Sequence, residues 1–381
     1  MPDSSVKAKQ AWLPPRPSKN TSVRQSLRGT FFGFLQKVAE TDDARTLWSR
    51  TLKGQLDWQP RLPPRAFTCP PPPYAELGTR PQPVRSVKEK ETIIITARFR
   101  SGSTFLWNLF RHIDGMTAYY EPFNERRWFN PQARGSTVDP THKHVDDYWR
   151  EYEGLEILSN FYREEWIEKN LYMEAAFWDP GMKQYVDLLI QQAPGRPVLQ
   201  FNRIDLRLPW FRQHFPDATI VHLYRHPRDQ WCSSLLDPRC FSKDGRMDQF
   251  SPHDKFYLRM WASDLKYHFP FLDEQHVVHP YQLFYYLWKI SYIFGLAFAH
   301  HSVAFEHVAT DPDTYLTRLL EAVNVRQYDL TKLKALIETA PLGKWREYAE
   351  DDWFKQHETN CETMLADFFA SLDGDGERQG R

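Results

Sequence analysis

The first residues suited to chemistry lie in the segment Thr96-Ala-Arg-Phe-Arg-Ser-Gly-Ser-Thr-Phe105. An apolar run precedes it and an amphipathic stretch follows, so it is predicted to turn from a strand into a helix. Free backbone N–H groups and the positive end of the helix dipole make such a turn a site for phosphate or sulfate. Gly102 lets the anion approach the backbone closely. The side-chain donors of this turn are Arg98, Arg100, Ser101, Ser103 and Thr104.

This turn differs from a Walker A loop. That loop requires Gly-x-x-x-x-Gly-Lys-Ser/Thr, whereas the segment here has one glycine and no such lysine. Nucleoside triphosphate chemistry with magnesium is therefore disfavoured. An ordinary helix cap formed by Ser-Gly-Ser-Thr is the alternative that the segment alone leaves open.

A second basic segment is Thr219-Ile-Val-His-Leu-Tyr-Arg-His-Pro-Arg-Asp-Gln-Trp-Cys-Ser233. An apolar strand is predicted to end at Arg225, and Pro227 suits the first turn of a new helix. Arg225 and Ser233, eight residues apart across this junction, could bind one phosphate. A surface cluster of salt bridges that includes Arg228 is the alternative interpretation.

Together the two segments resemble the donor-binding motifs of sulfotransferases that use 3′-phosphoadenosine 5′-phosphosulfate (PAPS). The resemblance extends over about residues 91–350 and is closest to the carbohydrate and protein-tyrosine branch. Tyr119-Tyr-Glu-Pro-Phe123 is similar to the Glu-Pro element of that branch, and Ser302-Val-Ala-Phe-Glu-His307 to a late strand that ends in Glu. Leu342-Gly-Lys-Trp-Arg346 resembles the Gly-x-Trp loop that closes near the cofactor.

The resemblance implies a role for each matching position. The backbone amides of residues 101–105 would bind the 5′-phosphosulfate, and Arg100 would stabilise charge on the leaving phosphate. Arg225 and Ser233 would bind the 3′-phosphate, and Phe105 would lie near the adenine. Arg98 and Lys344 would also contact the donor. No metal is expected, because arginines would neutralise the leaving group.

Glu121 is the candidate base for the acceptor hydroxyl, since it lies 21 residues after Arg100, as in tyrosine-directed relatives. Capping a helix, or pairing with Arg126 or Arg127, is the alternative role for this carboxylate. The small-phenol relatives place a His about 60 residues after the loop, and residues 156–164 contain none. His112, His142 and His144 are alternative bases. Asn202 and Arg203 follow another apolar run and are expected to line the acceptor or donor cleft.

Apolar runs that alternate with helical stretches predict an α/β fold, a P-loop-like three-layer arrangement with a central, mainly parallel sheet flanked by helices. Strands are expected at 91–97, 197–201, 218–224 and 302–305. Helical stretches are expected at 104–110, 142–192 and 255–299. The apolar run at 282–299 contains Lys289 and is interpreted as a buried helix rather than a membrane span.

The first 90 residues differ in composition, with 16 Lys and Arg, 7 Asp and Glu, and 13 of the 28 prolines. The predicted organisation is a basic N-terminal arm with short helices at 1–58, a Pro-rich linker at 59–90, a sulfotransferase domain at 91–370 and a disordered tail at 371–381. A cytoplasmic location is expected, because no signal peptide is recognised. Peripheral contact with a membrane and the oligomeric state stay open.

The expected function is sulfuryl transfer from PAPS to an acceptor hydroxyl, with a carbohydrate or glycan as partner. The net charge of zero argues against a nucleic-acid partner. A non-catalytic nucleotide-binding module and a P-loop kinase are the alternatives. Turnover would distinguish the first of these from a sulfotransferase, and magnesium dependence would favour the second.

Overall fold

The computed structural model describes residues 92–337 and 342–378. A five-stranded sheet lies at the centre of the described region, with strand order β2-β3-β1-β4-β5. Every strand pairing is parallel, which confirms the predicted fold class. The strands are β1 Ile93–Ala97, β2 Met116–Tyr120, β3 Arg196–Phe201, β4 Thr219–Tyr224 and β5 His301–Ala304.

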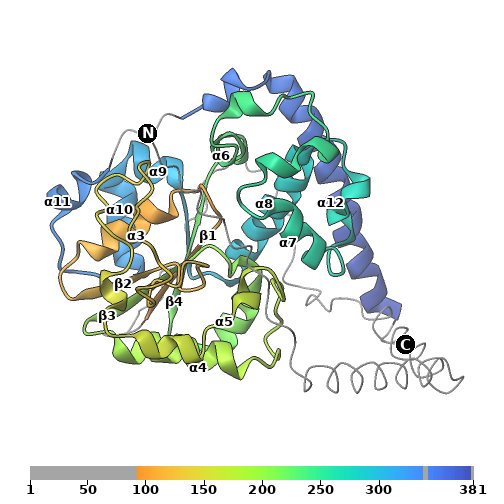
Figure 1. Ribbon diagram of the computed structural model, residues 1–381. Helices are drawn as coiled ribbons and strands as arrows, with labels where there is room; N and C mark the ends of the chain where they lie inside the picture. Colours follow the sequence, from red (N-terminus) through yellow and green to blue (C-terminus); the bar gives the residue numbers. More distant parts are fainter. Residues whose placement is uncertain (1–91, 338–341, 379–381) are drawn as a thin grey trace, which may run out of the picture. The chain divides into compact units, whose positions relative to one another are not determined.

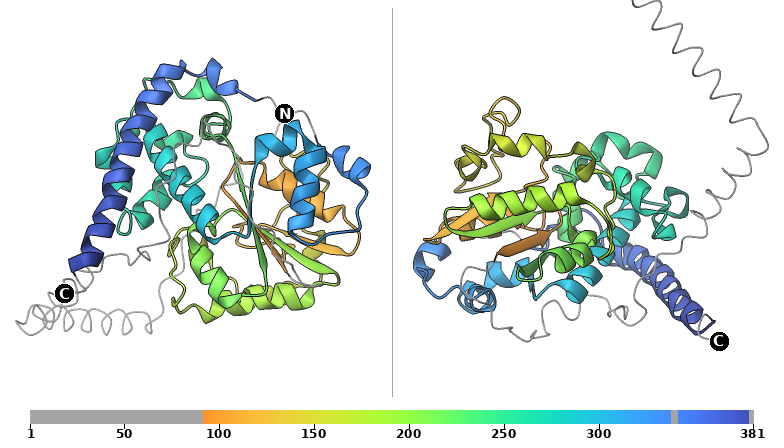
Figure 2. Two further views of the ribbon diagram at one scale, coloured as in Figure 1. Left: turned by 180° about the vertical axis from the view of Figure 1, so that it is seen from behind. Right: turned by 90° about the horizontal axis from the view of Figure 1, so that it is seen from below.

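Helices cover both faces of this sheet (Figures 1 and 2). Helices α3, α9 and α10 lie on one face, whereas α4, α5 and α8 lie on the other; α7 and α12 pack against α8. The helices are α3 Ser103–Arg111, α4 Pro180–Gln192, α5 Leu208–His214, α6 Pro227–Ser234, α7 Leu258–Leu265, α8 Pro280–Phe298, α9 Phe305–Thr310, α10 Pro312–Ala322, α11 Leu330–Lys334 and α12 Asp351–Arg378.

The central strand, β1, shows why its sequence forms a strand. Its Ile93, Ile94 and Ile95 are fully buried, since helices cover both of its faces. A continuous run of β-branched residues is typical of such a strand. The predicted strands at 91–97, 197–201, 218–224 and 302–305 match observed strands within a residue or two. Strand β2 was not predicted.

Two helical predictions require correction. The predicted stretch 142–192 contains only one α-helix, α4, preceded by short 3₁₀ turns at Arg150–Tyr152, Glu156–Asn160 and Glu164–Ile167. Gly154 and Asn170 adopt positive φ angles there, which a continuous helix excludes. The stretch 255–299 divides into α7 and α8. Pro270 begins a 3₁₀ turn between these two helices, and Pro280 is the first residue of α8.

Helix α8 corresponds to the apolar run at 282–299. It is buried along nearly its whole length, as predicted, and Lys289 within it pairs with Glu362 of α12 at 2.8 Å. Across the described residues, no helix combines the length and apolar character that a membrane crossing requires.

The ends of the chain bear on the predicted organisation. The predicted arm at 1–58 and linker at 59–90 lie outside the described residues. At the other end, α12 continues to Arg378, so most of the segment predicted as a disordered tail is helical. No proline interrupts the chain between Asp351 and Arg378.

Candidate active site

The carboxyl ends of the five strands meet at one edge of the sheet, where the chain forms a cavity of about 490 Å³. The register explains the convergence, because Ala97 of β1 pairs with Leu223 of β4, and Tyr224 pairs with Ala304 of β5. Each strand is therefore followed by residues that line the same cavity. These residues include Arg100, Glu121, Asn202, Arg225 and Phe305.

The turn between β1 and α3 forms one wall of the cavity. Gly102 caps α3 with a φ of 93°, a conformation that glycine adopts without strain. The first amide of the helix to donate to a backbone carbonyl is that of Leu106, which bonds to Gly102 at 3.1 Å. Within the described part of the chain, the amides of residues 102–105 have no backbone acceptor. Free amides at the N-terminus of a helix are the geometry that an anion site requires.

Ser101 acts differently from the prediction. Its hydroxyl donates to the carbonyl of Arg98 at 2.7 Å, and its amide points to the same carbonyl at 3.3 Å. The fully buried side chain therefore closes the turn and does not line the cavity. Ser103, Thr104 and Phe105 do line it.

Gly102 is also required by its surroundings. A Cβ atom at this position would lie 2.3 Å from the ring of Phe305 at the start of α9. Phe305 in turn contacts Phe105 edge to face, with ring centroids 6.2 Å apart, and lies under the guanidinium of Arg225 at 5.1 Å. One aromatic side chain thus connects the turn to the basic cluster after β4.

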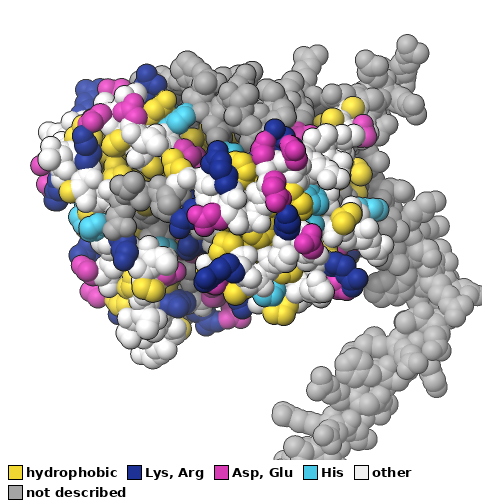
Figure 3. Space-filling model, turned by 90° about the horizontal axis from the view of Figure 1, so that it is seen from above, with side chains coloured by type: hydrophobic (Ala, Val, Ile, Leu, Met, Phe, Trp, Pro, Cys, Tyr) yellow, Lys and Arg dark blue, Asp and Glu magenta, His cyan; other side chains and the backbone are white. Residues whose placement is uncertain are grey.

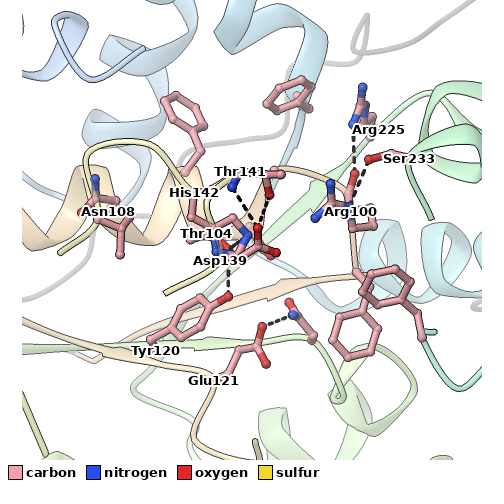
Figure 4. Close-up of a pocket in the computed structure, with 18 of the residues that line it drawn as sticks. Arg100, Thr104, Asn108, Tyr120, Glu121, Asp139, Thr141, His142, Arg225 and Ser233 are labelled. Carbon is pink, nitrogen blue, oxygen red and sulfur yellow. Dashed lines mark hydrogen bonds between the residues drawn. The ribbon is translucent and has the colours of Figure 1, made fainter. Parts of the chain in front are cut away.

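The two predicted donor motifs meet in the cavity (Figure 4). The Nε of Arg100 donates to the hydroxyl of Ser233 at 3.0 Å, and Nη1 of Arg225 donates to the carbonyl of Arg100 at 3.1 Å. The Nε of Arg225 is buried with no hydrogen-bond partner in the described structure. Burial lowers the pKa of this guanidinium, and the charges of Asp229 and Glu306 oppose the fall. These donors fit a phosphate-bearing ligand.

Two basic residues that were predicted to contact the donor lie elsewhere. Arg98 points away from the cavity, forming a 3.0 Å ion pair with Asp205 and stacking over Trp261. It is buried, and its charge is already balanced. Lys344 is exposed in the turn Lys344–Glu347 and is not among the residues that line the cavity.

Arg228 and Asp229 of the second motif position the chain around the cavity. Arg228 binds Glu358 of α12 through two hydrogen bonds of 2.8 and 2.7 Å. The carboxylate of Asp229 accepts hydrogen bonds from the amides of Gly343 and Trp345 at 2.8 and 3.2 Å. The motif is therefore no surface cluster of salt bridges. Arg225 lines the cavity, whereas Arg228 and Asp229 attach the C-terminal segment to α6.

Glu121 follows β2 and is buried, with its carboxylate directed into the cavity. One oxygen accepts a hydrogen bond from Asn202. The other accepts from Asn124 at 2.6 Å and from Arg203 at 3.3 Å. Burial raises the pKa of this carboxyl, and the charge of Arg203 and the hydrogen bond from Asn124 oppose the rise.

Asn202 and Arg203 have different places. Asn202 lines the cavity, as predicted. Arg203 is not among the lining residues and pairs with Glu121 instead. Arg203 is almost fully buried, with a second ion pair to Glu125 at 2.6 Å and stacking over Phe99 at 4.9 Å. It is placed to hold Glu121 rather than to contact a ligand directly.

Of the three histidines considered as bases, only His142 lines the cavity. Its Nδ1 lies 2.6 Å from the hydroxyl of Tyr148, and its Nε2 lies 3.3 Å from that of Thr104. Thr104 also contacts the hydroxyl of Tyr120 at 2.8 Å. Burial lowers the pKa of His142 to about 4, so the ring is neutral at pH 7.

Several cavity residues were missed by sequence reasoning. Among them are Phe99, Asn124, Asp139, Phe256 and Tyr257. The polar residue three positions after Glu121 and the adjacent aromatic pair at 256–257 were visible signals. Their convergence depends on loops that carry no periodic pattern.

Comparison with known proteins identifies the family of this chain. The model of the sulfotransferase family matches residues 92–329, and the chain belongs to that family. Among solved structures, the chain is similar to a sulfotransferase domain from the curacin biosynthetic pathway. That match has 14% identity and a TM-score of 0.39, and covers 72% of this chain and 98% of that one. No curated protein matches the chain significantly.

Family membership makes the protein a transferase of sulfuryl groups.

Over residues 92–337 and 342–378, no three His, Cys, Asp or Glu side chains are grouped as candidate metal ligands. On the face seen in Figure 3, Lys and Arg side chains alternate with Asp and Glu.

Proposed function

We propose that the protein transfers a sulfuryl group from PAPS to a hydroxyl of a carbohydrate. The observation that carries the proposal is the meeting of Arg100, Arg225 and Ser233 with the amides of residues 102–105 in one cavity. PAPS supplies the activated sulfuryl group when bound. Its two phosphate-bearing ends match two groups of donors. One group is at the N-terminus of α3, and the other is formed by Arg225 before α6 and Ser233 near the end of α6.

The roles of the residues on the donor side follow from their positions. Arg225 and Ser233 bind the 3′-phosphate, and the buried Nε of Arg225 gains the acceptor it lacks. The amides of 102–105 and the guanidinium of Arg100 bind the 5′-phosphosulfate. Arg100 also stabilises the negative charge that develops on the leaving phosphate. Positioned positive charge supplies much of the catalysis in such loose transfer reactions.

Glu121 removes the proton from the acceptor hydroxyl. Three donors hold the carboxylate in place: Asn124, Asn202 and Arg203. A carboxylate has about four acceptor positions, so one remains for the incoming hydroxyl. A pKa raised by burial makes the ionised form a stronger base than an exposed carboxylate.

A carbohydrate acceptor is supported by the lining beside Glu121. Tyr257 and Phe256 present aromatic surface to the cavity, and Asn124 and Asn202 present amide groups. Sugars combine apolar C–H faces with hydroxyl groups that hydrogen bond, so both kinds of surface are required to bind them.

Calorimetric binding of the desulfated product of PAPS, 3′,5′-adenosine bisphosphate (PAP), tests the donor site. Without magnesium, PAP should bind the wild-type chain and bind Arg225→Ala at least about 10-fold more weakly, since a hydrogen bond to a charged group contributes about 1.5–3 kcal/mol. Arg246→Ala removes an exposed arginine outside the cavity and should leave affinity unchanged. Absence of PAP binding by folded protein would refute the proposal. Binding without turnover in an acceptor screen would favour the non-catalytic module.

A further inference from the structure

Three cations line the cavity without a carboxylate partner: Arg126, Lys143 and Lys255. All three are exposed. Within the described residues none forms an ion pair. The guanidinium of Arg126 donates to Thr137 and stacks over Trp128 at 5.9 Å. Arg100 and Arg225, which also line the cavity, are assigned above to the phosphates of PAPS, so these three cations are charge that the donor does not account for.

Arg126 is tied to the proposed base. The amide of Arg126 donates to Oδ1 of Asn124 at 2.9 Å, and Nδ2 of the same Asn124 donates to Glu121 at 2.6 Å. The turn after β2 thus fixes the start of the Arg126 side chain beside the carboxylate that would receive the acceptor proton. An anionic group that contacts Arg126 would belong to the acceptor.

Lys255 lines the cavity from another segment of the chain. It precedes Phe256, which lies under the guanidinium of Arg100 at 5.9 Å, and Tyr257, whose ring lies 5.5 Å from the guanidinium of Arg203. Because Arg203 also pairs with Glu121, this segment lies between the proposed donor site and the place where the acceptor would bind.

The carboxylates of this region are already engaged. Glu125 pairs with Arg203 at 2.6 Å. Asp139 accepts two hydrogen bonds from Thr141, from the amide at 2.8 Å and the hydroxyl at 2.7 Å. Glu121 is held by its three donors. On the donor side, Arg100 and Arg225 are available for the phosphates of PAPS. The charge of Arg126 and Lys255 is therefore left for the acceptor.

We propose that the acceptor is an acidic carbohydrate, with a carboxylate or sulfate close to the hydroxyl that receives the sulfuryl group. This inference rests on the proposed function and narrows its acceptor class. Arg126 and Lys255 bind the anionic group and turn the neighbouring hydroxyl toward Glu121. An exposed arginine and lysine at the mouth of a cavity also attract an anionic substrate over a range of about 10 Å at 0.1 M salt.

Two matched disaccharides test the proposal by calorimetry on the full chain, with PAP present and absent. One carries a hexuronic acid, and the other the corresponding neutral hexose. The acidic disaccharide should bind more tightly to the wild type. Arg126→Ala and Lys255→Ala should each weaken its binding roughly fivefold, as expected of an ion pair at a partly exposed site. Binding of the neutral disaccharide should not change. Arg239→Ala, which removes an exposed arginine outside the cavity, is the control.

The outcomes separate this inference from the proposed function. Equal binding of the two disaccharides, or binding of neither, would overturn the acidic acceptor while PAP binding still supports the donor site. Weaker PAP binding by Arg126→Ala or Lys255→Ala, with disaccharide binding unchanged, would assign these cations to the donor and also overturn it. Selective binding of the acidic disaccharide without any PAP binding would retain the acidic ligand and refute PAPS as donor.

Discussion

The Nε atom of Arg100 donates a hydrogen bond of 3.0 Å to the hydroxyl of Ser233, although 133 positions separate the two residues in the chain. Arg100 follows β1, and Ser233 lies at the end of α6, which follows the adjacent strand β4. Parallel pairing of these strands brings both motifs to the same edge of the sheet. The two proposed phosphate sites thus share one hydrogen-bonded network.

Replacing Ser233 tests this network. Ser233→Ala removes one donor to the proposed 3′-phosphate and the partner of Arg100, so PAP affinity should fall about 5- to 10-fold, equivalent to about 1 kcal/mol or slightly more. Ser234→Ala is a matched control, because its hydroxyl donates to the carbonyl of Trp231 and does not line the cavity. Equal affinities of the two variants, measured by calorimetry, would exclude Ser233 from the donor site.

Glu121→Gln tests the base. The amide has nearly the same shape but cannot accept the proton, so kcat should fall about 10²-fold or more, the contribution expected of general base catalysis. PAP affinity should stay unchanged, since the carboxylate lies outside the proposed phosphate sites. His142→Gln, measured in parallel, distinguishes the alternative base that also lines the cavity. A large loss of kcat in His142→Gln alone would reassign the role.

The pH dependence of kcat reports the environment of Glu121. Only the ionised carboxylate can act as base, and burial raises its pKa, so activity should be lost on acidification at a higher pH than for an exposed glutamate. Removing the positive charge in Arg203→Gln should raise this pKa further and move the acidic limb of the profile to still higher pH.

Arg203→Lys is the matched control for that shift, because it retains the charge beside Glu121. Its acidic limb should lie closer to that of the wild type than the limb of Arg203→Gln does. Identical acidic limbs in all three proteins would show that Arg203 does not act on the titrating group.

The attachment of α12 to α6 predicts a difference in stability. Glu358 is buried and binds Arg228 with both oxygens, whereas Asp351 binds the same arginine from an exposed position. Glu358→Gln should lower the free energy of unfolding by about 3–5 kcal/mol, because it weakens a buried ion pair from one side. Asp351→Asn should cost much less than Glu358→Gln, because solvent screens an exposed pair. Chemical denaturation measures both, and similar losses would contradict the assigned burial.

Four of the five strands, and the turns that follow β1 and β4, were predictable because their signals are local. A continuous apolar run such as Ile93 to Ile95 can be fully buried only where both faces of the strand are covered. Gly102 and Pro227 mark turns through their own backbone preferences. The order of strand, turn and helix was therefore readable without knowledge of any long-range contact.

Other predictions failed or stayed incomplete because the deciding contacts are distant. The segment before α4 has helical spacing in places, yet turns at Gly154 and Asn170 direct its aromatic residues into the core. Arg98 and Arg100 are both basic residues in one turn, and only the position of Asp205 determines that Arg98 faces away from the cavity. Asp229 holds the loop at Gly343 and Trp345, and Lys344 between them is exposed.

The sequence alone determined the α/β architecture, the turn at residues 100–105 between a strand and a helix, the basic segment at 225–233 and the carboxylate at Glu121. These features depend on residue type and on short-range order. Only the tertiary structure decided that Arg203 pairs with Glu121, that Phe305 joins Gly102 to Arg225, and that Arg126 and Lys255 line the same cavity as Glu121. The reason is physical: the burial and pairing of a charge depend on neighbours far away in the chain, which a one-dimensional pattern does not contain.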